Sequence, residues 1–91
     1  MTLKIDRIRA KRRTVIRLSG ELHSENLGTL KCEIARNQPR IALDLQELDL
    51  VDLEGVRFLN ECQSEGISVL HSSPFIREWM SEERKKETED R

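Results

Sequence analysis

The strongest hydrophobic pattern lies in the middle of the chain, over residues 41–60. Its opening run is aliphatic and lacks regular polar alternation, which is typical of a strand buried on both faces. This run consists of Ile41, Ala42, Leu43 and, after Asp44, Leu45. A polar link at Gln46 and Glu47 then separates the strand from a second apolar patch, formed by Leu48, Leu50 and Val51.

After Asp52, the apolar residues recur with the periodicity of a helix. The apolar positions form one stripe, with Val56, Leu59 and Cys62 three residues apart and Phe58 beside them. We expect Asp52 to cap this helix and Gly66 to end it in a left-handed conformation. A strand, a tight acidic turn and a helix make a βα unit. In such a unit the helix N-terminus beside the sheet edge is a common meeting point for ligands and partners.

Two strands are predicted before this unit. Residues 1–9 alternate loosely, with Leu3 and Ile5 on one face, which predicts a half-buried, highly charged edge strand. A turn at residues 10–13 leads to a second strand over residues 14–19, which we expect Gly20 to end. The two strands are expected to form an antiparallel hairpin.

A first helix is predicted between this hairpin and the central unit. Ser24 is in position to cap it, and the helix is expected to end near Arg36, before Asn37 and Pro39. Its apolar positions fall on one face: Leu27, Leu30, Ile34 and Ala35.

The chain after Gly66 predicts one more strand and one more helix. Residues 67–71 form a short apolar segment, and Ser73-Pro74 has the order of an N-cap and a first helical residue. We expect Phe75 and Trp79, four residues apart on the helix over residues 75–83, to pack together on the sheet. The element order predicts an α/β domain over residues 1–80, with a small mixed four-stranded sheet and three helices. The charged tail, residues 81–91, is expected to fray or to continue as solvated helix.

The charge is unevenly distributed along the 91 residues, although the net charge is only -1. Up to Arg13 there are six basic residues and one acidic residue, and the remainder has 10 basic and 16 acidic residues. A basic arm can indicate nucleic-acid binding, but no aromatic residue interleaves this one and no helix carries it. The arm is therefore interpreted as a solvated hairpin, and no nucleic-acid partner is expected.

Few residue groups suggest catalysis or metal binding. The spacings of His23, Cys32, Cys62 and His71 match no zinc pattern, so neither a metal nor a cofactor is expected. The two thiols are expected to be reduced in a cytoplasmic protein. Nothing approaches ~18 consecutive apolar residues, so no membrane insertion is expected. An acidic group near one end of the sheet can bind Mg²⁺ or act in acid–base chemistry, but no glycine-rich phosphate loop accompanies it: Asp44, Asp49, Asp52 and Glu54.

Three short motifs resemble the STAS domain, a family that includes bacterial anti-sigma-factor antagonists and the cytoplasmic ends of sulfate transporters. They are Leu18-Ser19-Gly20-Glu21-Leu22, Ile41-Ala42-Leu43-Asp44-Leu45 and Val51-Asp52-Leu53-Glu54-Gly55-Val56. The resemblance runs from about Arg13 to Met80. It implies strands in nearly sequential order, helices stacked beside the sheet, and a cytoplasmic, non-enzymatic module that regulates transcription by protein–protein interaction.

The resemblance also implies a partner-binding surface around the helix that starts at Asp52. Its residues are Asp52, Leu53, Glu54, Gly55, Arg57 and Phe58. In antagonist members this corner reads Asp-Ser-Ser-Gly, and the partner kinase phosphorylates the second serine. Here Leu53 and Glu54 replace the two serines, so the phosphorylation switch cannot operate at this position. Glu54 is either a partial mimic of the phosphoserine, with one charge against ~-1.5 to -2, or simply a favourable first-turn residue.

The implied partner is another protein, either an anti-sigma factor of the kinase type or a component of a transporter. Two other functions stay open. One is an accessory STAS subunit of a membrane transporter. The other is a small nucleotide-binding or enzymatic α/β domain that uses the acidic corner. The lack of a glycine-rich loop and of an activated nucleophile argues against the enzyme.

Overall fold

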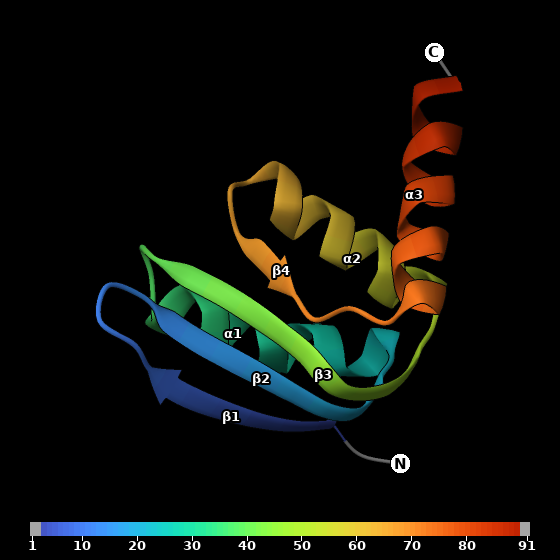
Figure 1. The fold of residues 1–91 in the computed structure, drawn as a ribbon. Coiled ribbons are helices and arrows are strands. Elements are labelled where there is room, and N and C mark those ends of the chain that lie inside the picture. The colour runs from blue at the N-terminus through green and yellow to red at the C-terminus, as the bar shows by residue number, and fades with distance from the viewer. Residues whose placement is uncertain (1–2, 90–91) are drawn as a thin grey trace.

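Four strands form one mixed sheet in the order β1-β2-β3-β4 (Figure 1). The computed structural model describes residues 3–89. β1 (Leu3–Arg9) is antiparallel to β2 (Thr14–Leu22), and the two parallel strands that follow are β3 (Ile41–Val51) and β4 (Ser68–Leu70). The predicted α/β class and the sequential strand order are both confirmed. Met1 and Thr2 of the predicted first strand lie outside the described residues.

Two helices connect the parallel strands, and one more follows the last strand. Their bounds are Leu27–Arg36 for α1, Leu53–Ser64 for α2 and Pro74–Glu89 for α3, with a short 3-10 turn, η1, at Ser24–Asn26. α1 follows β2 and lies behind the sheet in Figure 1. α2 follows β3 and packs beside α1, where the Lys31 ammonium lies 5.7 Å from the centre of the Phe58 ring. α3 packs against α2.

One hydrophobic core fills the space between the sheet and the helices. The apolar phases of the predicted elements place nine residues in one core, and seven of them are buried: Ile16, Leu18, Ile41, Leu43, Leu45, Val56 and Leu59. The other two, Val69 and Trp79, are partly buried and pack against its edge. The core is therefore formed mainly by aliphatic side chains of β2, β3 and α2, the same elements that lead to the acidic turn at Asp52.

Both central strands are longer than the sequence pattern predicted. Gly20 does not end β2: it has a φ of 97° and lies inside the strand, next to an irregularity in the pairing with β3. Glycine tolerates this positive φ, so the strand continues through the bulge to Leu22. Gln46 and Glu47 are likewise exposed positions within β3 rather than a link between two apolar segments.

The start of the first helix also differs from the prediction. Ser24 is the first residue of η1, and α1 begins only at Leu27, without a side-chain hydrogen bond from a capping residue. The end near Arg36 is confirmed. Leu30 and Ile34 are buried, but Ala35 is exposed, so the predicted apolar face of α1 is buried only in part.

α3 begins as predicted and then packs through an unexpected face. The Ser73 hydroxyl accepts a hydrogen bond from the Ile76 N–H at 3.2 Å, which confirms the cap. Phe75 contacts Trp79 with ring centres 5.8 Å apart, but it is 68% exposed, so the predicted packing of Phe75 on the sheet is wrong. Ile76 and Met80 are the buried pair instead.

The charged tail continues α3 as far as Glu89, one of the two expected outcomes. Its first part is anchored to α2. Glu83 is buried, with one carboxylate oxygen 3.5 Å from Arg57 and the other 3.3 Å from Lys86. The Asn60 amide nitrogen donates to the Met80 carbonyl at 3.0 Å.

Candidate functional site: the corner at the start of α2

The corner lies where the two central strands, β2 and β3, reach their C-terminal ends on the same side of the sheet. The Asp52 N–H donates to the Leu22 carbonyl at 3.1 Å, which joins the two strand ends. Asp52 Oδ1 then accepts a hydrogen bond from the Gly55 N–H at 2.8 Å. The predicted N-cap is confirmed, because a side-chain oxygen satisfies a first-turn N–H that has no partner within the helix.

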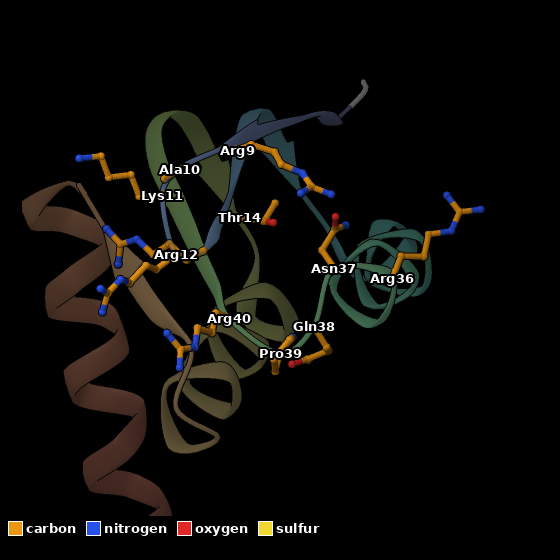
Figure 2. Close-up of a pocket in the computed structure, with 11 residues that line it drawn as sticks. Arg9, Ala10, Lys11, Arg12, Thr14, Arg36, Asn37, Gln38, Pro39 and Arg40 are labelled. Carbon is orange, nitrogen blue, oxygen red and sulfur yellow. The ribbon is translucent and has the colours of Figure 1, made fainter.

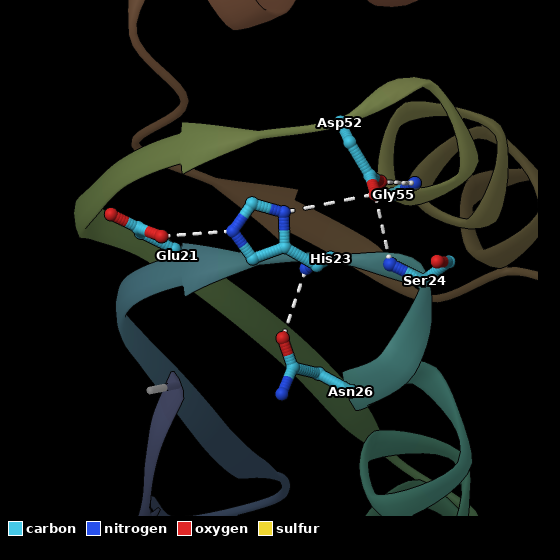
Figure 3. A network of polar contacts seen from close by, with 6 residues as sticks. All are labelled: Glu21, His23, Ser24, Asn26, Asp52 and Gly55. Atoms are coloured by element: carbon cyan, nitrogen blue, oxygen red, sulfur yellow. Dashed lines mark hydrogen bonds and ion pairs between the residues drawn. The ribbon is translucent and has the colours of Figure 1, made fainter. Parts of the chain in front are cut away.

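The second oxygen of the same carboxylate organises the other side of the corner (Figure 3). Asp52 Oδ2 accepts a hydrogen bond from the Ser24 N–H at 2.9 Å and lies 3.7 Å from His23 Nδ1. The other ring nitrogen, Nε2, is 2.8 Å from Glu21 Oε1. The backbone N–H of His23 donates to Asn26 Oδ1 at 3.0 Å. Asp52 therefore ties the start of η1 to the start of α2.

The two titratable groups at the centre of this network have shifted pKa values. Burial alone raises the pKa of Asp52, but the hydrogen bonds from the Gly55 and Ser24 N–H groups and the nearby His23 outweigh it, so the pKa is lowered. The hydrogen bond to Glu21 raises the pKa of His23, and the charges of Glu21, Asp52 and Glu25 add to the effect. Asp52 is thus held as an anion, and protonation of His23 is favoured.

Gly55 allows α2 to approach the strand ends closely. A Cβ atom at this position would lie 2.5 Å from Val51 Cγ2 and 3.0 Å from the Leu22 carbonyl oxygen. Both distances are shorter than ordinary packing allows, and the second contact is with the backbone. The residue at this position must therefore lack a side chain if the first turn is to lie against β2 and β3.

The predicted partner-binding residues divide into an exposed group and a buried group. Leu53 is 38% exposed, and the side chains of Glu54 and Arg57 are at least half exposed, with their charged groups 3.6 Å apart. Gly55 and Phe58 are buried, so they support the helix from within. Arg57 also pairs with Glu83, which links the exposed first turn of α2 to α3.

Sequence reasoning missed two parts of the corner. Glu21 and His23 belong to it because β2 continues past Gly20, where the strand was expected to stop. Leu50 is 53% exposed and pairs with Glu21 across β2 and β3, so it adds an apolar side chain to the surface. The alternation of Leu48, Asp49 and Leu50 would place both leucines on the buried face, but a register shift in the pairing with Gly20 and Glu21 breaks it.

Asp44 does not join the acidic group expected near one end of the sheet. Asp44 is buried, and its Oδ2 lies 3.3 Å from Arg17 Nε. Its Oδ1 accepts a hydrogen bond from the Gln46 N–H at 2.9 Å. Asp44 lies in the first half of β3, paired with Arg17 of β2 and Leu70 of β4, and so lies away from Asp52. Asp44 therefore neutralises Arg17 within the sheet.

The described residues contain no metal-binding cluster, and both of their cysteines are free. Among the described side chains, those of residues 3–86, no three His, Cys, Asp or Glu residues are placed to hold a metal ion. Cys62 is buried, which raises the pKa of its thiol to about 12, and Cys32 lies exposed on a different helix. Within the same range, no helix combines the length and the apolar character needed to cross a membrane.

Comparison with known proteins assigns no family to the chain. No protein-family model matches the sequence, and none of the curated proteins matches it significantly. The resemblance to the STAS domain therefore rests on the three short motifs and on the order of the elements.

Proposed function

We propose that this chain is a non-enzymatic, STAS-like protein-interaction module, similar to anti-sigma-factor antagonists but without the phosphorylatable serine. One observation carries the proposal: the first turn of α2 presents Leu53 and Glu54 to solvent at a corner fixed from behind by Asp52 and Gly55. Leu50 on β3 adds exposed apolar area near this turn. A rigid surface that combines exposed leucines with charged side chains suits protein docking.

The chemistry of the corner supports recognition over reaction. Both carboxylate oxygens of Asp52 already accept backbone hydrogen bonds, and its lowered pKa makes it a weak base. Glu54 is open to solvent and close only to Arg57. The thiol on this helix, Cys62, is buried on its inner face about two turns beyond Glu54, so neither carboxylate can act on it.

Glu54 is the residue through which this module would differ from antagonists that are regulated by phosphorylation. Its negative charge lies in the first turn, where the helix dipole stabilises it by roughly 0.3 to 1 kcal/mol. We infer that Glu54 holds the surface permanently in a state similar to the phosphorylated one, which binds a kinase-type anti-sigma factor weakly. The cytoplasm is the compartment in which such a partner would be met.

The test is calorimetric titration of the wild type and Glu54→Ser against a purified anti-sigma factor of the kinase type. Glu54→Ser is expected to tighten binding by about 2 kcal/mol, because a charge desolvated at an interface is removed. The melting temperature should hardly change, since Glu54 is exposed. Glu61→Ser, which removes the same charge from the exposed side of the same helix, is the matched control and should leave the affinity unchanged.

Two results would contradict this proposal in different ways. Weaker binding of Glu54→Ser would make Glu54 a direct attractive contact and exclude the phosphoserine-like role. An unchanged affinity, or equal changes in Glu54→Ser and Glu61→Ser, would place the docking surface elsewhere on the molecule.

A further inference from the structure

A hollow of about 600 Å³ lies at the end of the molecule where β2 and β3 begin (Figure 2). The β1–β2 turn forms one wall, and the connection from α1 to β3 forms the other. The Thr14 N–H donates to the Arg40 carbonyl at 2.8 Å and holds the two walls together. The lining residues are Arg9, Ala10, Lys11, Arg12, Arg13, Thr14, Arg36, Asn37, Gln38, Pro39 and Arg40.

The lining carries six basic residues and no acidic one. Arg36 is close to Glu33, with a 3.4 Å contact. The other five basic side chains, Arg9, Lys11, Arg12, Arg13 and Arg40, make no ion pair or hydrogen bond with the side chains that the structure describes, those of residues 3–86. Five exposed cations without a carboxylate among them make this end of the molecule electropositive, and an anionic ligand would be attracted to it.

The positive surface continues around the start of β3. A second hollow, of about 300 Å³, shares Arg12, Arg13 and Arg40 with the first and extends to Gly66 and Ser68. Figure 2 shows the Arg12 and Arg40 side chains extending to the same side of β3, although they come from different loops. These arginines therefore stand between two adjoining depressions, an arrangement that suits an extended ligand better than a single ion.

We propose that this basic end binds an acidic segment of a partner protein. The guanidinium group of arginine has a planar fork that matches a carboxylate, and arginine is the main basic residue here. The Thr14 hydroxyl and the Gln38 amide in the same lining offer hydrogen-bonding groups to a peptide backbone. A ligand with carboxylates spaced along a chain can contact the two depressions together.

The charge distribution favours a short acidic peptide over a nucleic acid or a membrane. The chain outside the first 13 residues has six more acidic than basic residues, so a long polyanion would meet repulsion beyond the hollow. No aromatic side chain lines the hollow to stack on bases, and no large apolar side chain lines it to insert among lipids.

This site is separate from the corner at Asp52. The hollow lies where the parallel strands begin and the corner where they end, and β3 has 11 residues. At ~3.3 Å per residue the two sites are roughly 30 Å apart, several Debye lengths at physiological salt. The inference therefore does not depend on the function proposed for the corner.

The experiment measures fluorescence anisotropy of labelled decaglutamate with the full chain, at low salt and at about 0.15 M salt, where the Debye length falls to ~8 Å. Arg12→Ala/Arg40→Ala is expected to weaken binding roughly tenfold or more, because each depression loses two cations. Lys4→Ala/Lys85→Ala removes the same charge from exposed positions outside the hollow and should have a much smaller effect. Glu54→Ser should bind decaglutamate like the wild type. Unchanged melting temperatures check that both double variants are folded.

Two further probes decide between kinds of polyanion: a short DNA duplex, and vesicles of equal parts phosphatidylcholine and phosphatidylserine. Both probes are expected to bind more weakly than decaglutamate. Tighter binding of either probe would overturn the assignment to an acidic peptide. No decaglutamate binding at low salt, or equal losses in the two double variants, would show that the hollow is only a solvated surface.

Discussion

At the scale of single residues, two glycines give opposite expectations for the same substitution. Gly55→Ala places a Cβ atom 2.5 Å from Val51 Cγ2 and 3.0 Å from a backbone oxygen. We expect it to lower the free energy of unfolding by ~1 to 3 kcal/mol, because the first turn of α2 must move away from the strand ends. Urea denaturation of the two proteins measures the difference.

Gly28→Ala is the matched control, since Gly28 also lies in the first turn of a helix. No atom lies within 4 Å of a Cβ at that position, so alanine is expected to stabilise the protein by up to ~1 kcal/mol. If Gly55→Ala were as stable as the wild type, the close approach of α2 to Leu22 and Val51 would not be essential to the corner.

His23 should make the stability of the corner depend on pH. Its pKa is raised above 6.5 in the folded protein, mainly by the hydrogen bond to Glu21. The contribution of the protonated ring to the stability of the fold is therefore fully present below pH 6.5. It is lost as the pH rises through the folded-state pKa. The urea midpoint of the wild type should be higher than that of His23→Gln. The difference should be larger at pH ~5.5 than at pH ~8.

An NMR titration of the His23 ring gives a direct check. Glu21→Gln should lower the measured pKa of His23, because it removes the charge that favours the imidazolium ion. A pKa that does not respond to Glu21→Gln would contradict the contact between the two side chains.

The corner also shows which residue roles can be predicted from sequence. The Asp52 cap was predictable, because it depends on the local order of an acidic residue and an apolar helical stripe. The contact of His23 with Glu21 was not. It depends on the positive φ of Gly20, which continues β2 for two more residues. The sequence pattern does not distinguish a glycine that ends a strand from one that bulges it.

At the scale of elements, β3 should show how strongly position within the strand determines stability. Leu43 has no exposed surface and lies between Ile16 of β2 and Val69 of β4. Leu43→Ala is expected to lower the free energy of unfolding by ~2 to 5 kcal/mol through the cavity it leaves. Leu50→Ala, on the same strand, should change it by less than ~0.5 kcal/mol, because Leu50 is 53% exposed.

Denaturant titration of both variants decides this, and Leu43→Val keeps the comparison possible if Leu43→Ala does not fold. A loss below ~1 kcal/mol for Leu43→Ala would mean that β3 is not the central strand of the core.

The element order was predictable from periodicity, but the packing of α3 was not. Two pairs with a spacing of four residues compete on this helix, Phe75 with Trp79 and Ile76 with Met80. The aromatic pair has the larger apolar area, yet the aliphatic pair is buried against α2. The choice depends on how the chain leaves β4, where His71 has a positive φ of 58°, and no local sequence pattern indicates this rotation.

At the scale of the whole molecule, the parallel strands separate two surfaces with different chemistry. The class of fold and the place of the corner followed from the sequence, because a βα unit exposes its helix N-terminus in any such sheet. The basic hollow could not be predicted in the same way. Arg36 and Arg40 join the basic hairpin only because the connection from α1 returns to the end of the sheet where β2 starts.

If the two ends act independently, a ligand at one should leave the other undisturbed. Chemical shifts of the backbone amides during a titration with decaglutamate should move in residues 9–14 and 36–40 and stay constant around Asp52. The pKa of His23 should be the same with and without the peptide, because the two sites are about 30 Å apart and mobile ions, with a Debye length of ~8 Å, screen the added charge. Shifts at both ends, or a changed His23 pKa, would instead show that the rigid β2–β3 pair couples the basic hollow to the corner.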